Sequence, residues 1–282
     1  PPDLVITLDS MTEPDCQLAN GSISVTGSGG NGGSYSYNWL DFAFDPIFPN
    51  QTTSAAVNLF AGIYNVVVSD VNGCSDTFGI ILNNNNAADI ALDSIVNVSC
   101  FGECDGAIMV TLSGGTTPYT IQWSSGGTME DDSNLCAGID TIAVADSNLC
   151  LSFGIYEVLE PSELILESLD VTGVICGSAC DGEITANISG GSEPYVVTWS
   201  NGATGVTATD LCAGVYGVTI TDANGCSVSS SANVSGPTAM VVTLDSTNDA
   251  TCEYTGDGNV YVTVTVGSPG YSYRWSNGST DT

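Results

Sequence analysis

The sequence predicts an all-β protein made of tandem immunoglobulin-like β-sandwich repeats with disulfides inside each repeat. Three observations predict this fold: a 76-residue period, short segments in which apolar and polar residues alternate, and cysteines that recur with the same period. Self-similarity at a fixed period indicates an array of small units. The period is carried by Trp123, Trp199 and Trp275, by Asp105, Asp181 and Asp257, by Gly62, Gly138 and Gly214, and by Cys74, Cys150 and Cys226.

The period also sets the expected domain boundaries. Equivalent junctions fall at Pro1, Asn85, Pro161 and Pro237, and each precedes a predicted strand. We therefore expect a first repeat at 1–84 with an insertion within 40–58, a second at 85–160, a third at 161–236 and a partial fourth at 237–282. Because the junctions are brief, we expect a semi-rigid string, with more bending at the Asn-rich segment 83–86 than elsewhere.

The third repeat shows the strand pattern most clearly. One face of a strand carries Ile184, Ala186 and Ile188, and a later strand presents Tyr216, Val218 and Ile220. Alternation with a period of two predicts half-buried strands, and Asn201-Gly202 predicts a tight hairpin turn. Short strands at this spacing, separated by Gly and Asn turns, are typical of a β-sandwich with almost no helix.

A tyrosine begins a late strand in the motif Leu-x-Ala-Gly-x-Tyr. The motif ends at Tyr64 in the first repeat and at Tyr216 in the third, while Asp140 replaces the tyrosine in the second. Immunoglobulin-like sandwiches place a corner tyrosine at such a position. The following cysteine is ten residues further on instead of two, so the likeness is one of architecture.

Sorting the eleven cysteines by repeat predicts nested disulfides. One pair occurs in every complete repeat: Cys16 with Cys74, Cys100 with Cys150, and Cys176 with Cys226. A second pair, Cys104 with Cys136 and Cys180 with Cys212, occurs only in the middle two repeats, and Cys252 stands at the first position of the fourth. Zinc bound by four thiolates is the competing interpretation, but the first repeat lacks the second pair and follows the same pattern elsewhere. Disulfides indicate an oxidising or extracellular location.

The charge balance excludes several classes of partner. The chain has 32 acidic residues, one Lys or Arg and no His, for a formal net charge of −31. Nucleic acids and anionic membrane surfaces attract clustered Lys and Arg, which are absent here. No apolar run reaches the length of a membrane span, and no signal peptide is recognisable, so we expect an internal piece of a longer exported protein without direct membrane insertion.

Two groups of acidic residues are candidate sites, each with a structural alternative. The first group has oxygen-bearing side chains at the ends of strands, which suit calcium as ligands. The alternative is that these side chains cap turns by bonding to their own backbone. The residues are Asp70, Asn72, Asp146, Asn148, Asp222 and Asn224. The cluster Glu130-Asp131-Asp132 offers paired carboxylates of the kind glycosidases use, but it is absent from the other repeats and fits a solvated loop better. We expect no cofactor apart from calcium and no catalytic residue.

Aromatic residues provide two further candidates. The tyrosines and tryptophans of the strands could stack on sugars, although their alternation favours packing in the core. The insertion carries Phe42, Phe44 and Phe48, and apolar residues on an exposed loop indicate a binding surface. The alternative is that the insertion folds back over its own sandwich.

The ordered motifs of the third repeat resemble the SprB-type repeat of Bacteroidota cell-surface adhesins. They are Cys176, Asp181-Gly182, the Ser-Gly-Gly at 189–191, Pro194-Tyr195, the Trp-Ser-Asn-Gly at 199–202, the tyrosine motif at 211–216, and the Thr-Asp-Ala-Asn-Gly-Cys at 221–226. The resemblance implies a very long protein exported by the type IX system and displayed on the bacterial cell surface, in some members as a mobile adhesin of gliding cells. It also implies O-glycosylation where Asp precedes a hydroxyl residue, at Ser10, Ser94, Thr141 and Ser246. The alternative is that chance produces this pattern in a Ser/Thr-rich chain.

These observations favour a non-enzymatic structural segment that forms a stalk or filament and displays adhesive regions. The alternatives are an array of glycan-binding modules and a self-assembling extracellular filament. The expected partners are other repeats of the same long chain, extracellular surfaces or polysaccharide, and further copies of the chain.

Overall fold

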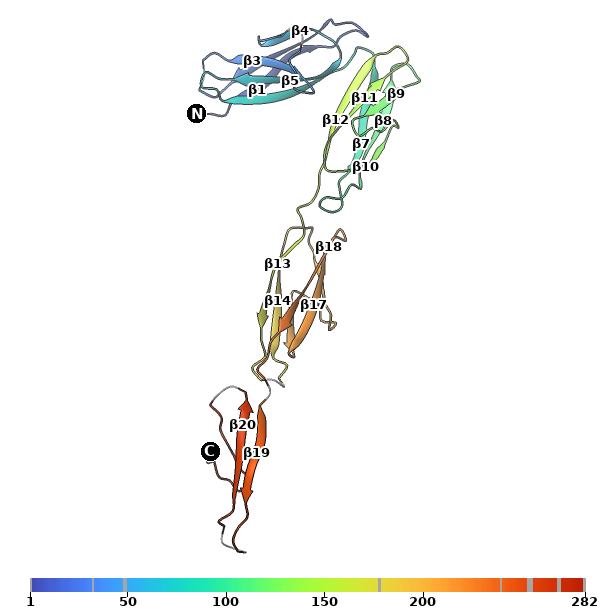
Figure 1. The fold of residues 1–282 in the computed structure, drawn as a ribbon. Helices are drawn as coiled ribbons and strands as arrows, with labels where there is room; N and C mark the ends of the chain where they lie inside the picture. Colours follow the sequence, from blue (N-terminus) through green and yellow to red (C-terminus); the bar gives the residue numbers. More distant parts are fainter. Residues whose placement is uncertain are drawn as a thin grey trace. The chain divides into compact units, whose positions relative to one another are not determined.

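The computed structural model describes residues 2–31, 33–47, 50–176, 179–238, 240–252, 256–267 and 270–280 (Figure 1). Within these residues the chain forms strands and turns, and no helix. Two compact units are present, Pro1–Glu160 and Pro161–Thr282. The predicted all-β class is confirmed.

The first repeat contains six strands in two three-stranded antiparallel sheets. One sheet has the order β1-β2-β4 and the other β3-β5-β6. The strands are β1 (Val5–Thr12), β2 (Gly21–Ser28), β3 (Ser36–Asp41), β4 (Ala55–Leu59), β5 (Gly62–Ser69) and β6 (Ser75–Leu82).

The second and third repeats have the same topology. Their sheets have the orders β7-β8-β10 and β9-β11-β12, then β13-β14-β16 and β15-β17-β18. The strands of the second repeat are β7 (Ala88–Val96), β8 (Gly106–Gly114), β9 (Thr120–Trp123), β10 (Asp132–Leu135), β11 (Gly138–Ala145) and β12 (Leu151–Val158). Those of the third are β13 (Ile165–Thr172), β14 (Gly182–Ser189), β15 (Val196–Trp199), β16 (Thr207–Leu211), β17 (Gly214–Thr221) and β18 (Ser227–Val234).

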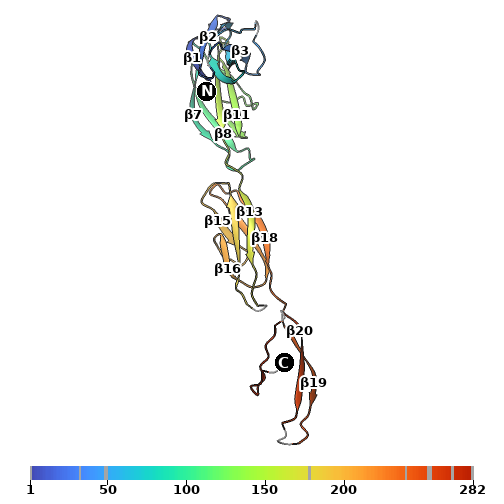
Figure 2. The ribbon, with the colours of Figure 1, turned by 90° about the vertical axis from the view of Figure 1, so that its left-hand side faces the viewer.

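The strand order is that of an immunoglobulin-type sandwich. The first, second and fourth strands form one sheet, and the third, fifth and sixth form the other, which corresponds to strands A-B-E and C-F-G of an immunoglobulin domain. Figures 1 and 2 show the strands of the third repeat running alongside one another in two layers. In the fourth repeat, β19 (Val241–Asn248) pairs with β20 (Asn259–Val266).

Each sandwich is filled by inward-facing residues around one tryptophan. Trp39, Trp123 and Trp199 are all buried, with 0%, 1% and 4% of their surface exposed. Each indole Nε1–H donates a hydrogen bond of 2.9 Å to a backbone carbonyl, that of Thr53, Met129 or Gly205 respectively. A buried indole needs such a partner. These tryptophans are therefore core residues, and sugars cannot stack on them.

The corner tyrosines hold the end of the sandwich as expected. The Tyr64 hydroxyl donates to the Phe60 carbonyl at 3.0 Å, and the Tyr216 hydroxyl donates to the Cys212 carbonyl at 3.1 Å. In the second repeat the buried Asp140 instead accepts hydrogen bonds from the Thr141 N–H at 2.9 Å and from the Ser124 hydroxyl. Its second oxygen, Oδ2, is buried and has no hydrogen-bond partner among the described residues.

Glycine is required where the second strand of each complete repeat begins, because both the opposite sheet and the neighbouring strand come close. A Cβ on Gly182 would lie 2.6 Å from Cγ1 of Val234 and 2.8 Å from the carbonyl oxygen of Leu211. The same crowding occurs at Gly21 and Gly106.

We predict that Gly182→Ala destabilises the third repeat by about 1–3 kcal/mol, because the added methyl group overpacks a rigid backbone contact. The control is Gly214→Ala, whose Cβ would lie 3.9 Å from its nearest neighbour, Cε2 of Tyr216. Urea unfolding of the full chain, resolved by repeat with hydrogen-exchange mass spectrometry, measures both changes. Equal stability of the two variants would contradict this packing argument.

Candidate functional site

The joint between the first two repeats is held by a disulfide that the cysteine pattern did not predict. Cys16, in the loop between β1 and β2, is bonded to Cys150, in the turn between β11 and β12. Their Cα atoms are 4.7 Å apart, although 134 positions separate them in the sequence. The predicted pairs Cys16–Cys74 and Cys100–Cys150 are therefore wrong. The pair Cys176–Cys226 is also wrong, because Cys176 is an exposed free thiol while Cys226 is disulfide-bonded.

Strand direction explains the error. The fourth strand ends beside the loop that holds the first cysteine, since Leu59 pairs with Gly21, and the fifth strand then runs eight residues away from that end to the last cysteine. The two cysteines consequently lie at opposite ends of a sandwich whose strands have eight residues, or about 25 Å of length. A disulfide needs Cα atoms within about 7 Å, so these two positions cannot bond within one repeat.

The second predicted pair is confirmed in both middle repeats. Cys104 is bonded to Cys136 and Cys180 to Cys212, with Cα separations of 3.9 and 3.8 Å. These bonds form because the loop after the first strand and the loop after the fourth strand lie at the same end of the sandwich. Since all four sulfurs are oxidised, they cannot serve as zinc thiolates.

Asparagines of the linker reinforce the joint with hydrogen bonds to both repeats. The buried Asn84 donates from Nδ2 to the carbonyls of Pro14 and Asp15, at 3.2 Å each. Its Oδ1 accepts from the N–H of Leu151 at 2.7 Å, and its own N–H donates to the Leu151 carbonyl at 2.8 Å. A buried amide with all of these partners fixes the backbone on either side, so the expectation of greater bending at 83–86 finds no support in this geometry.

Two further contacts connect the repeats beside the disulfide. The Asn83 side chain accepts a hydrogen bond from the N–H of Phe153 at 2.9 Å, which aligns the linker with β12. Gln17, next to Cys16, donates to the carbonyl of Asn148 at 3.1 Å. The linker, the Cys16 loop and the Cys150 turn thus form one hydrogen-bonded junction.

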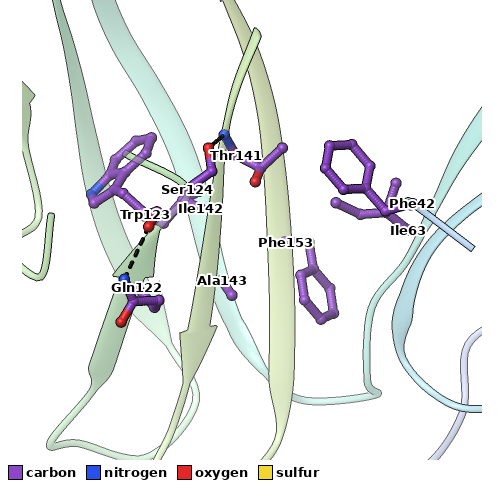
Figure 3. Close-up of a pocket in the computed structure, with 9 residues that line it drawn as sticks. All are labelled: Phe42, Ile63, Gln122, Trp123, Ser124, Thr141, Ile142, Ala143 and Phe153. Atoms are coloured by element: carbon purple, nitrogen blue, oxygen red, sulfur yellow. Dashed lines mark hydrogen bonds between the residues drawn. The ribbon is translucent and has the colours of Figure 1, made fainter. Parts of the chain in front are cut away.

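A cleft of about 260 Å³ lies beside this junction, between the insertion of the first repeat and the surface of the second repeat (Figure 3). Phe42 and Ile63 line it from the first repeat, and Phe153 and Ile142 line it from the second. In Figure 3, Phe42 and Ile63 lie on the same side of the second repeat as the side chain of Phe153. The cleft is mainly apolar, as binding sites for small ligands usually are.

The insertion partly covers its own sandwich and partly remains exposed. Ile47 packs against the core of the first repeat, as the alternative interpretation expects. Phe42 and Phe44 remain 47% and 59% exposed, and Phe44 has a positive φ of 63°. Phe48 lies outside the described residues. Binding by these phenylalanines stays a prediction.

The turn that carries the last cysteine is organised by one buried aspartate in each repeat. Asp146 Oδ1 accepts from the N–H groups of Asn148 and Cys150, at 2.8 and 3.0 Å, and Oδ2 accepts from the N–H of Thr116 at 2.9 Å. Asp70 and Asp222 make the equivalent bonds to Asn72 and Cys74 and to Asn224 and Cys226. These carboxylates cap their turns and position the cysteine.

Hydrogen bonding to the ionised form changes the acidity of these groups. The N–H of Cys150 contributes most to lowering the pKa of Asp146, and burial opposes it. The N–H of Asn31 has the same leading part in lowering the pKa of Asp70. Burial alone would raise the pKa of Asp222, but the N–H groups of Ser192, Cys226 and Asn224 outweigh it, so that the pKa is lowered. The folded state therefore favours the carboxylate in all three turns.

The calcium interpretation gains no support from this arrangement. Both oxygens of each aspartate already face N–H dipoles, whose positive ends repel a cation. Among the described residues, no three or more acidic, cysteine or histidine side chains group as metal ligands.

The cluster Glu130-Asp131-Asp132 supports the sheet edge. Glu130 accepts from the N–H of Leu112 at 2.8 Å, and Asp131 accepts from the N–H of Val110 at 3.1 Å. In the third repeat a backbone carbonyl, that of Val206, fills the corresponding place by accepting from Ala186. The two carboxylates thus substitute for backbone acceptors along β8.

The candidate glycosylation residues lie on strands. Ser10, Ser94 and Ser246 are exposed, and each directly follows a register shift in the first strand of its repeat, whereas Thr141 is half-buried in β11. The preceding Asp9, Asp93 and Asp245 each accept a hydrogen bond from a threonine of the neighbouring strand. The Asp-Ser pairs therefore have a structural reason to recur, and glycosylation stays a prediction.

We predict that the turn aspartates stabilise the fold above about pH 4 and that this contribution is lost as the pH falls, because their folded pKa values lie below the unfolded value of about 3.9. Asp222→Asn should destabilise the third repeat by about 1.5–3 kcal/mol at pH 7, since the amide cannot accept at both positions. Its stability should also change less than that of the wild type between pH 5 and pH 2. Hydrogen exchange of β17 measures this, with β11 as the internal reference, and parallel pH curves for the two proteins would contradict the assignment.

We also expect a chelator to leave the melting temperature unchanged at low salt, because the turn carboxylates are satisfied by N–H donors. The measurement compares the dialysed chain with and without EDTA, and then with added calcium. A fall in melting temperature on chelation that calcium restores would establish a calcium site.

The comparisons with known proteins identify the repeats. The family model "SprB repeat" matches four times, at residues 9–44, 92–128, 168–204 and 244–280, which together cover just over half of the chain. No curated protein matches the chain in sequence. Among the described residues, no helix is long and apolar enough to cross a membrane.

Several solved structures are similar at a low level. The three N-terminal domains of the bacteriophage RB49 Hoc protein are 11% identical with a TM-score of 0.32, over 82% of this chain and 97% of that one. The N-terminal eight immunoglobulin domains of DSCAM are 11% identical with a TM-score of 0.33, over 86% of this chain and 35% of that one. Chicken CNTN1 FN1–FN3 domains are 9% identical with a TM-score of 0.26, over 83% and 98%. Such low scores carry no functional argument, whereas the family match does: this chain belongs to the SprB repeat family, whose repeats occur in cell-surface proteins.

Proposed function

We propose that the chain is a non-enzymatic structural segment of an extracellular adhesin, which forms a stalk that holds adhesive regions away from the bacterial surface. The observation that carries this proposal is the disulfide between Cys16 and Cys150, which joins two successive sandwiches at a second covalent point. A second covalent link of this kind adds nothing to a binding site, whereas in a stalk it limits how far the two repeats extend under force. The gliding and type IX contexts follow from the family alone.

The disulfide shortens the covalent path through the two repeats. From the start of the chain to Glu160, that path runs along residues 1–16, crosses to Cys150 and continues along 150–160. Residues 17–149 lie in a closed loop outside it. Tension along the stalk therefore cannot extend this loop, even when the sandwiches unfold.

The chemistry of the side chains supports a structural role. The chain has no histidine and one Lys or Arg, so histidine general bases and clusters of cationic side chains that stabilise anionic transition states are missing. The acidic cluster at Glu130 and Asp131 is bonded to backbone amides of β8. An array of glycan-binding modules is less well supported, because the strand tryptophans are buried.

Force spectroscopy tests the proposal on the full chain. In the oxidised wild type, the 134-residue segment closed by Cys16 and Cys150 should contribute no extension, although its full length would be about 450 Å. Cys150→Ser should lengthen the fully extended chain by about 200–350 Å, since other disulfides keep part of the segment closed. Cys74→Ser is the matched control and should change nothing, because Cys74 is a free thiol.

An extended length that is the same for the wild type and Cys150→Ser would overturn the force path. A stalk role also requires that the chain keeps its sandwiches under tension. If the wild type extended fully at forces that leave isolated immunoglobulin-like domains folded, the proposal would fail.

A further inference from the structure

We propose that the bond between Cys16 and Cys150 is one step of a staggered disulfide series, in which the first cysteine of each repeat bonds to the last cysteine of the next. Its next step is a bond between Cys100 and Cys226. In such a series, each repeat is joined to the next by a disulfide as well as by the backbone. It concerns the covalent structure of the array and goes beyond its role as a stalk.

The first cysteines of the three complete repeats have the same local setting. Each follows the first strand, in a loop that one side chain ties back to the backbone at its start. Asn20 accepts from the N–H of Asp15 at 2.8 Å, Asp105 from that of Ser99 at 2.9 Å, and Asp181 from that of Ile175 at 3.1 Å. The loop that presents Cys16 to its partner therefore recurs at Cys100 and Cys176.

The last cysteines are equally alike. The N–H groups of Cys74, Cys150 and Cys226 each donate to Oδ1 of the turn aspartate four residues earlier, at 3.0, 3.0 and 2.9 Å. The turn that presents Cys150 to Cys16 thus occurs in every complete repeat. Both local settings of the bond between Cys16 and Cys150 therefore recur, the first around Cys100 and the second around Cys226.

The oxidation states agree with the series. Cys100 and Cys226 are both disulfide-bonded, while Cys74 and Cys176 are exposed thiols. Pairing within repeats predicts instead that all four cysteines are bonded. It also requires a disulfide to connect the two opposite ends of one sandwich. Cys74 has the position of a last cysteine and Cys176 that of a first one, and these are the two thiols that a staggered pairing among the three complete repeats leaves over.

The sequence separations fit as well. Cys100 and Cys226 are closer in sequence than Cys16 and Cys150, and the difference equals the extra length that the insertion gives the first repeat. Outside the insertion, the two pairs enclose the same elements in the same order.

The bond-forming chemistry is ordinary thiol oxidation. The two thiols lose two protons and two electrons, one S–S bond forms, and a disulfide of an exported thiol oxidoreductase is reduced to two thiols. No other group of the chain takes part. The expected setting is an oxidising compartment, where such oxidants maintain disulfides.

Disulfide mapping of the full chain tests the series. The protein is alkylated without reduction and digested with pepsin at acid pH, which suppresses thiol–disulfide exchange by keeping thiols protonated. Mass spectrometry should find a peptide with Cys100 linked to one with Cys226, alongside the Cys16–Cys150 link. Alkylated Cys74 and Cys176 should also be found.

Two serine variants separate the series from its alternatives. In Cys226→Ser, Cys100 should become accessible to alkylation while the Cys16–Cys150 and Cys180–Cys212 links remain. In the matched control Cys212→Ser, only Cys180 should become accessible. A link from Cys100 to any cysteine other than Cys226, or a Cys100 that is alkylated in the wild type, would overturn the proposal.

Discussion

The distance between the two ends of a sandwich is the constraint on which this architecture depends. Eight-residue strands place the loop with the first cysteine and the turn with the last cysteine about 25 Å apart. A disulfide between such positions must therefore join different repeats, as Cys16 and Cys150 do. The bond links the end of the first sandwich at which β1 finishes to the end of the second sandwich at which β11 finishes. The neighbouring hydrogen bonds of Asn84 and Gln17 align these two ends.

The repeat pattern predicted the fold well, because each repeat contains its own signals. Alternating residues identified the strands, and the tyrosine motif predicted corner positions for Tyr64 and Tyr216, whose hydroxyls donate to backbone carbonyls in the structure. It could not decide the main cysteine pairing. The period places a last cysteine in every complete repeat. It does not decide whether a first cysteine bonds to the last cysteine of its own repeat or to that of the next repeat. Strand direction distinguishes the two possibilities, since the fifth strand starts at the Cys16 end of the sandwich and carries the chain to Cys74 at the other end.

The second pair was predictable because it involves no such ambiguity. Cys104 and Cys136 appear together in the second repeat and are absent together from the first, and both follow strands that end on the same side. The insertion and Asp140 were harder to interpret. Phe42 of the first repeat and Phe153 of the second line the same cleft. The sequence of one repeat does not indicate which residues of the neighbouring repeat lie next to it.

The turn aspartates connect the unusual charge of the chain with the joint. With one Lys or Arg among 282 residues, ion pairs cannot offset a formal charge of −31. The chain instead stabilises its buried carboxylates with backbone N–H groups, as at Asp146, where the same bonds orient Cys150 toward Cys16. The joint contains a disulfide and the amide hydrogen bonds of Asn84 and Gln17, and its carboxylates, such as Asp15 beside Asn85, accept hydrogen bonds in place of ion pairs. The negative charges of the surface repel one another, and the covalent bond between Cys16 and Cys150 holds the two repeats together against that repulsion.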